Sequence, residues 1–511
     1  MKTRNALFAA LFVFLLLFFP LALNAQEDFG FGDQDFGFGE SDSGAGFFSP
    51  PRFSVSLGGE VRAELKLFYD DLSSGETFKN IQLGDIFSGS LSFDAAGSMA
   101  EGYVKLNLVP VFDAPLRSRG SSPVALDEAF VRAFFGPVTI TGGLKKLTWG
   151  KADSFGPLDL VNPLDYSDLS KISDPQSVKL ARPMIHASWS MGSFSKLEAV
   201  FVPWFQGHKF ATSGRWVPGQ IDDLRAVLEV TLGQAAIIAQ GMITDPSDPT
   251  DAGLVLLNKI LTFGNSLESS ILDGSIFPST DTLKYAQAGT RFTTTLGSSD
   301  LGFQYYFGRF PRPVVSGLNP MLFISSLPTP NPNFDALVPD INYNYYHHIG
   351  VDYAQVIFGF NVRAEAGANI TADLDGTDGT IENPALLWSL GFDRDLFWNI
   401  NLNLQGNGRI RLFQNQISDN PLVDCEAGTK ASSTRITGIL SRKFLRDELE
   451  IKISALWGIE DKDFFIAPAL SWARNDVKTE LSAGFFGGDK KGELGQYKDN
   501  SFLRIALSYK F

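Results

Sequence analysis

Amide and guanidinium side chains recur at every second residue between positions 397 and 412, in the stretch FWNINLNLQGNGRIRL. This polar series comprises Asn399, Asn401, Asn403, Gln405, Asn407, Arg409 and Arg411. Such groups form hydrogen bonds with sugars and carboxylates, and the charge of arginine strengthens them. Arg409 and Arg411, beside the amides, are therefore the best candidates for contact with a solute.

The alternation identifies the element that must carry this polar series. The other parity is apolar, and only two glycines interrupt it; it consists of Trp398, Ile400, Leu402, Leu404, Gly406, Gly408, Ile410 and Leu412. A period of two is typical of a strand, whose successive side chains point to opposite faces. At 16 residues the stretch is far longer than the usual strand of about 5 to 6 residues. A wall between lipid and water explains both the length and the parity.

Similar alternation recurs in 53–68, 356–369, 448–457 and 477–485. The polar parities there and in neighbouring segments mix both signs of charge: Glu60, Arg62, Glu64, Lys66, Glu128, Arg132, Arg363, Glu365, Glu450, Lys452, Lys478, Glu480 and Arg504. We expect these residues to line a water-filled pore, where charge selects among solutes. Alternatively, neighbouring opposite charges neutralise each other as a network in the wall.

The amino terminus predicts export. Lys2 and Arg4 precede an apolar run and then LALNA, so residues 1–25 are expected to be a signal peptide. A membrane anchor is the alternative, but the run is shorter than the roughly 20 residues of a spanning helix. Residues 26–52 are acidic, rich in Gly and Phe, and repeat DFGFG. They are expected to form a disordered periplasmic leader, or alternatively to dock their Phe side chains on a partner.

Composition narrows the function classes. The formal charge is −14, so nucleic acid is a poor partner. A single Cys excludes disulfides within the chain. With only four His and no GxSxG, HExxH or paired-Cys motif, the sequence predicts no enzymatic activity, and we expect no metal and no cofactor. The enzymatic alternative is a barrel hydrolase with Ser and His on its outer wall.

Connection lengths give an independent test, because outer-membrane barrels alternate short periplasmic turns with longer outer loops. Short turns are expected near 97–101, 136–137, 191–194, 233–234, 298–299, 352–355, 394–396, 445–447 and 475–476, and long loops near 70–82, 112–125, 150–182, 205–221, 310–343, 371–383, 414–432 and 488–500. Residues 251–274 are either a hairpin or a helical segment in a long loop. The count is 22 strands with the hairpin and 20 without it, within a range of 16 to 22. An even count places both termini on the periplasmic side.

The carboxy-terminal strand and one internal segment resemble known outer-membrane barrels. Leu503, Ile505, Leu507, Tyr509 and Phe511 alternate up to the last residue. This pattern resembles the signal by which the barrel-assembly machinery recognises its clients.

Residues 127–169 resemble a stretch of alginate-export-type porins and a related uncharacterised barrel group, in which "EAYV" precedes "GRQ…WG" and then "NP.D". The matching residues are Glu128, Ala129, Phe130, Val131, Gly143, Lys145, Trp149, Gly150, Asn162, Pro163 and Asp165. Lys145 and Lys146 stand where those barrels carry Arg and Gln.

The same segment contains the candidate constriction loop. Trp149 is expected at a membrane interface, and Gly150 begins a long connection, which is usually functional or mobile. A turn at Asn162, Pro163 and Asp165 would fold this loop into the bore and narrow it. Alternatively, it is an outward surface loop. The Pro-rich loop 310–343 is the second candidate lid.

These observations predict an all-β, antiparallel up-and-down barrel over residues 53–511, in the outer membrane of a diderm bacterium, with no plug domain because the 27-residue leader is too short for one. Its expected function is porin-like passive diffusion of small polar or amphipathic solutes. A surface adhesin or structural barrel is the alternative. Expected partners are outer-membrane lipid, the barrel-assembly machinery, small solutes and further copies of the chain.

Overall fold

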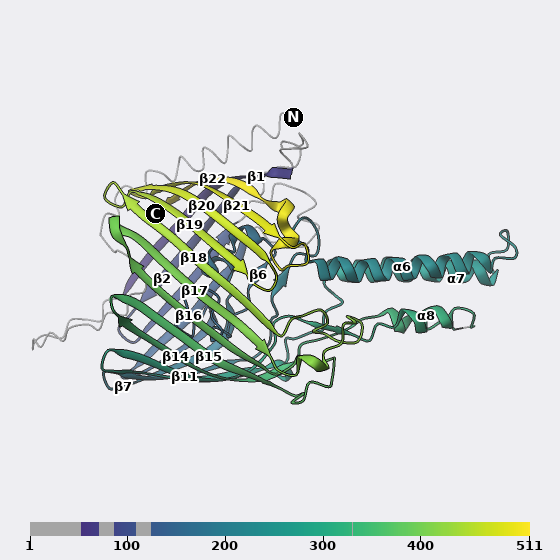
Figure 1. Ribbon diagram of the computed structural model, residues 1–511, viewed down its shortest axis with the longest axis horizontal. Helices are drawn as coiled ribbons and strands as arrows, with labels where there is room; N and C mark the ends of the chain where they lie inside the picture. Colours follow the sequence, from purple (N-terminus) through teal and green to yellow (C-terminus); the bar gives the residue numbers. More distant parts are fainter. Residues whose placement is uncertain (1–52, 71–85, 109–123, 330) are drawn as a thin grey trace, which may run out of the picture.

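A single closed sheet of 18 antiparallel strands dominates the computed structural model, which describes residues 53–70, 86–108, 124–329 and 331–511 (Figure 1). Each barrel strand pairs with the next along the chain, and the last returns to the first, where Lys510 lies opposite Glu60. Closure leaves no unpaired sheet edge. The expected leader and signal peptide lie outside the described residues.

The barrel strands are β1 (Ser54–Phe68), β2 (Phe87–Ala96), β3 (Ala100–Leu108), β4 (Val124–Phe135), β5 (Val138–Lys145), β7 (Arg182–Met191), β8 (Ser195–Val202), β10 (Gln287–Leu296), β11 (Ser299–Arg309), β14 (Tyr345–Ile357), β15 (Phe360–Thr371), β16 (Ala385–Asp395), β17 (Ile400–Arg411), β18 (Ser432–Phe444), β19 (Leu449–Gly458), β20 (Asp463–Arg474), β21 (Val477–Gly488) and β22 (Phe502–Lys510). Two small sheets join β6 (Asp165–Tyr166) to β9 (Lys209–Phe210), and β12 (Val314–Ser316) to β13 (Asp340–Asn342). The barrel count falls inside the expected range of 16 to 22 but below the favoured 20 to 22.

Alternation along each strand separates the two faces of the wall. Val61 and Leu65 are exposed on the outside of β1, while the charged side chains between them face the bore. On β17, the two glycines that interrupt the apolar face lie beneath Trp388 of β16, and a Cβ at Gly408 would come within 2.7 Å of the Trp388 indole nitrogen. A large aromatic on one strand thus covers the backbone that the glycines of its neighbour expose.

Short connections lie at one end of the barrel and long ones at the other, except that the short connection 459–462 between β19 and β20 lies at the long-loop end. Both described ends of the chain reach the short-turn end. Two expected turns are displaced. Residues 352–355 lie inside β14, and the turn is at Phe358–Gly359. The turn expected at 394–396 extends through η6 (Phe397–Asn399), where Trp398 and Asn399 both have positive φ. Since this backbone cannot continue a strand, β17 begins at Ile400 and Asn399 does not share the face of the other amides.

The turn expected near 233–234 is wrong, because this position lies within helix α6 (Gly219–Gly241). Residues 251–274 form α7 (Ala252–Asp273), so the helical alternative is confirmed. Buried residues of α6 recur at helical spacing, at Leu228, Thr231, Ala235 and Ala239. Replacing four expected strands by two helices lowers the count from 22 to 18 and keeps it even.

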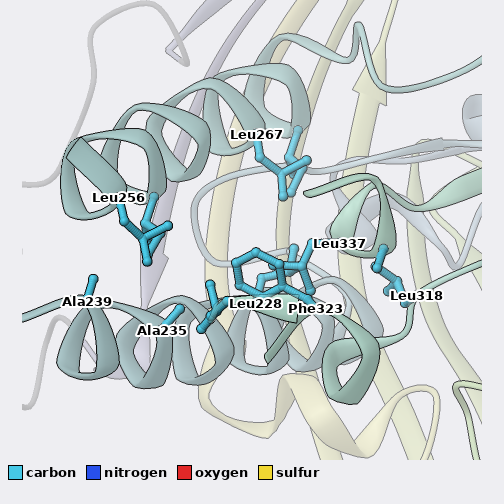
Figure 2. Close-up of a cluster of buried hydrophobic side chains, with 12 residues drawn as sticks. Leu228, Ala235, Ala239, Leu256, Leu267, Leu318, Phe323 and Leu337 are labelled. Atoms are coloured by element: carbon cyan, nitrogen blue, oxygen red, sulfur yellow. The ribbon is translucent and has the colours of Figure 1, made fainter. Parts of the chain in front are cut away.

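Helices α6 and α7 extend away from the barrel at the long-loop end (Figure 1). α8 (Pro320–Ser326) and η5 (Phe334–Leu337) complete a hydrophobic core with them, and Phe323 lies at its centre with no exposed surface (Figure 2). We call these four elements the helical projection. With 23 residues, α6 is about 35 Å long. No helix among the described residues is long and apolar enough to cross a membrane.

Candidate functional site: the bore and its inner loop

Residues 146–181, which connect β5 to β7, enter the bore and are named the inner loop. Glu365 of β15 binds its first turn: the carboxylate accepts hydrogen bonds from the backbone N–H groups of Lys151, of Ala152 at 2.8 Å and of Leu158 at 3.4 Å. Since Glu365 is only 4% exposed, these donors replace the water that a carboxylate otherwise requires. The inner loop is thereby attached to the opposite wall.

Gly150 allows this close approach. Its φ of 96° lies in the region that favours glycine, and a Cβ on it would overlap the Glu365 carboxylate. The sequence motif includes Gly150, and the contact with Glu365 gives a physical reason for a glycine there. The loop itself begins four residues earlier than the sequence predicted, because β5 ends at Lys145.

The amide series on β17 holds the next part of the inner loop. Gln405, 1% exposed, accepts from the backbone N–H groups of Asp153 (2.9 Å) and Ser154 (3.1 Å) and donates to the carbonyl of Ser154. Asn407 donates to the carbonyl of Phe155 at 3.0 Å. Asn403 donates to the Asp153 carboxylate at 2.8 Å. These amides face the bore, and their partner there is the chain itself.

Asn162 joins the two ends of the inner loop. Its Oδ1 accepts from the N–H of Leu147 at 2.7 Å, and its Nδ2 donates to the carbonyls of Lys145 (3.0 Å) and Leu180 (2.8 Å). The carbonyl of Pro163 also accepts from the N–H of Leu180. Asn162 itself is buried, and its bond to Leu147 is shielded from water.

Trp149 does not lie at a membrane interface. It is 2% exposed and packs inside the barrel in a cluster with Leu147, Val161 and Tyr306, its ring meeting that of Tyr306 edge to face. β5 ends at Lys145, four residues before the tryptophan, because the chain turns inward there instead of continuing the strand.

Asp165 links the inner loop to the next long loop. It lies on β6, which pairs in parallel with β9, and its carboxylate lies 3.0 Å from the Lys209 ammonium. His208 accepts a hydrogen bond at Nδ1 from the N–H of Leu164. Burial lowers the pKa of His208 to about 3, which keeps this acceptor neutral.

The rest of the bore contains an open cavity of about 1370 Å³. Its wall is formed by β1, β2 and β18 to β22, and the far part of the inner loop closes its side. Lys66 connects the two, with its ammonium 3.0 Å from Asp168 and 2.7 Å from the hydroxyl of Ser170. Eight of the residues expected in the pore line this cavity: Arg62, Glu64, Lys66, Glu450, Lys452, Lys478, Glu480 and Arg504.

Three further expected pore residues, Arg363, Arg409 and Arg411, do not line this cavity and are held in ion pairs. Arg363 pairs with Asp153 of the inner loop and with Asp393 at 2.6 Å. Arg409 and Arg411, at the long-loop end of β17, both pair with Glu426, at 3.4 and 2.9 Å. Contact of these arginines with a solute stays a prediction, and a solute would compete there with an existing carboxylate.

An ionic cluster joins the long loops outside the inner loop. Glu493 pairs with Arg312 and, at 3.0 Å, with Arg435. The charge of Arg312 lowers the pKa of Glu493 to about 2. In the loop after β15, burial instead raises the pKa of Glu382 to about 6.

The last strand closes the barrel with its expected alternation. Leu503, Ile505, Leu507 and Phe511 are exposed on the outside, and Tyr509 stacks on Phe511 at 6.3 Å. Phe511 exchanges two backbone hydrogen bonds with Gly59 of β1. These are the five residues of the expected assembly signal, and recognition by the assembly machinery stays a prediction.

Several residues of the site could not be predicted from the sequence alone. Asp153, Asp168 and Arg215 lie in irregular segments, and Lys171 lies in the short 3-10 helix η3 (Leu169–Lys171); neither has a periodicity that marks which side chains reach the bore. In the described part of the chain, no three or more His, Cys, Asp or Glu side chains gather in a way that suits a metal ion.

Comparisons with known proteins find likeness in structure but not in sequence. No protein-family model and no curated protein sequence matches the chain. A BenF-like porin from Pseudomonas fluorescens has a TM-score of 0.44 at 7% identity, covering 90% of this chain and 98% of that one. OccK9 (OpdG) of Pseudomonas aeruginosa has 0.43 at 8%, covering 90% and 98%. OmpF of Salmonella typhi has 0.37 at 6%, covering 89% and 97%. Values this low assign neither a family nor a solute to the chain.

Proposed function

We propose that this protein is an outer-membrane channel for passive diffusion of small polar solutes. The observation that carries the proposal is a closed barrel whose bore is narrowed, but not filled, by the inner loop. Bare apolar side chains on the outer face suit lipid, and charged side chains on the inner face suit water. In this proposal the short-turn end, with both termini, faces the periplasm.

Single-channel conductance of the refolded protein in a planar bilayer tests this function. Discrete, long-lived steps are expected, with heat-modifiable migration on gels as the check of barrel folding. A heat-modifiable barrel that gives no steps would rule the channel out.

A surface adhesin or structural barrel is the second candidate, favoured by the helical projection. It extends from the long-loop end and leaves apolar side chains such as Val230 and Ile237 exposed, at 61% and 69%. Binding of the refolded protein to host matrix without any conductance would favour this function.

Kinship with alginate-export-type porins is a finer proposal, supported by the residues of the 127–169 motif. Its Glu128 accepts a hydrogen bond from the backbone N–H of Lys146 at 2.9 Å, at the point where the inner loop leaves β5. The motif thus includes residues that direct the loop. We also propose the assembly machinery as the partner of the last strand, and association with further copies of the chain.

A further inference from the structure

The open cavity is more basic than the chain that builds it. Its described lining residues include seven basic and five acidic side chains, whereas the whole chain has 43 basic against 57 acidic. The basic ones are Arg62, Lys66, Lys171, Arg215, Lys452, Lys478 and Arg504, and the acidic ones are Glu64, Asp168, Asp174, Glu450 and Glu480. The acidic excess of the chain therefore lies elsewhere.

Two basic side chains of β1 share one carboxylate of that strand. Glu64 lies 2.8 Å from Arg62 and 3.8 Å from Lys66, and Lys66 also reaches Asp168 of the inner loop. On the adjacent strand β22, a further basic residue, Arg504, lies directly opposite Lys66 in the register. Like charges placed opposite each other repel, so these carboxylates hold the basic groups together.

Glu480 of β21 likewise pairs with two basic groups. Its carboxylate lies 3.2 Å from Lys478 and 3.0 Å from Arg504. Four basic groups thus surround three carboxylates along β21, β22, β1 and the inner loop, which leaves a surplus of positive charge at this wall.

Lys452 of β19 adds a charge without an ion pair. Within the described part of the chain no carboxylate lies in salt-bridge range of its ammonium, and the same holds for Lys171 of the inner loop. Glu450, two residues before Lys452 on the same face, lies directly opposite Lys443 of β18 in the register. Its negative charge therefore has a basic neighbour of its own.

We propose that this cavity makes the channel selective for small anions, including carboxylates such as acetate, over cations of similar size. The inference rests on the proposed channel function. A wall with surplus positive charge raises the local concentration of anions and lowers that of cations. The effect is greatest at low salt, where screening is weak and the field of the wall charges extends over longer distances.

Reversal potentials across a salt gradient test the selectivity, first in KCl and then in potassium acetate. The anion is expected to be roughly threefold more permeant than potassium in dilute KCl, with a smaller ratio in concentrated KCl. The sign of the potential is expected to stay the same in acetate. A cation preference in either salt overturns this inference and leaves the channel function intact, whereas absence of any conductance step overturns the channel function itself.

Charge variants locate the selectivity in the cavity. Lys452→Glu is expected to lower the anion-to-cation ratio by roughly half or more, and Lys452→Gln by less. Lys491→Glu, an equal charge change on the exposed loop after β21, is expected to leave the ratio within about a tenth of the parent value. Each variant is first checked for heat-modifiable migration. If both Lys452 variants fold and keep the parent ratio, the cavity does not set the selectivity.

Discussion

The inner loop and the helical projection leave the same end of the barrel and lie in opposite directions. The inner loop buries apolar side chains such as Trp149 against the barrel wall, and hydrogen bonds to polar side chains of the bore, above all Glu365 and Gln405, also hold it there. The helical projection makes a core among its own elements, centred on Phe323, and extends away from the wall (Figure 2). Attachment to the bore wall thus directs one loop inward, whereas burial of apolar side chains among its own elements lets the other extend away from the barrel.

Deleting the inner loop and, separately, helices α6 and α7 should give the largest difference between the two regions. Replacing residues 151–177 by a short Gly/Ser linker should raise single-channel conductance roughly twofold, because the bore loses its largest obstruction. The matched control replaces residues 219–274, which deletes α6 and α7, and should leave conductance nearly unchanged. Equal conductance in the two deletions would contradict the assignment of the inner loop as the constriction.

Phe323→Ala should destabilise the helical projection by about 3 to 5 kcal/mol, because it leaves a cavity in a small core. Faster amide hydrogen exchange in α6 and α7 is the expected result, with heat-modifiable migration of the barrel unchanged. Met321→Ala is the control, since Met321 is 79% exposed two residues away. Loss of the barrel together with the projection would show that the two cores are not independent.

Asn162→Ala should weaken the closure of the inner loop by about 1 to 3 kcal/mol, because it leaves buried backbone groups at both ends of the loop without partners. Noisier open-channel current is the measurement. Asn258→Ala, on the exposed face of α7, provides the control and should give the parent's noise. A quiet Asn162→Ala channel would mean that Glu365 and Gln405 suffice to hold the loop.

Acid should loosen the long loops outside the bore, with the smallest effect. The pKa of Glu493 falls from its ordinary 4.5 to about 2 in the folded protein, so its pairing is stabilising above about pH 4.5 and is lost as the pH falls toward 2. The half-exposed position of the pair limits this effect. Proteolysis of the loop after β21 should rise over that interval in the parent, and Glu493→Gln should show the raised rate already at pH 6. A pH-independent rate in the parent would contradict the role of this cluster.

The strands of the barrel could be predicted because their environment has two sides. Lipid outside and water inside impose a period of two on each strand, as in β1, β17 and β22, and the alternation of loop lengths follows from the same geometry. The sequence of α6 wrongly predicts a turn near 233–234, because the small residues around Gly233 resemble a turn between two short apolar runs. Only its packing against α7 selects the helix.

The candidate site, too, could be predicted only in part from the sequence. The bore-facing parity of residues such as Arg62, Gln405 and Glu365 is visible in the sequence, but their partners are not. Asp168 contacts Lys66, and Asp153 contacts Gln405 and Arg363. The two residues of each contact are about a hundred residues or more apart along the chain.

The amino-acid sequence by itself determined that the chain forms a lipid-facing barrel, since alternation is a local property that each strand carries alone. The tertiary structure decided which side chains remain available in the bore. Gln405 and Asn407 bind the inner loop, while Lys452 faces an open cavity, because hydrogen bonds between segments far apart in the chain depend on where closure of the barrel brings them.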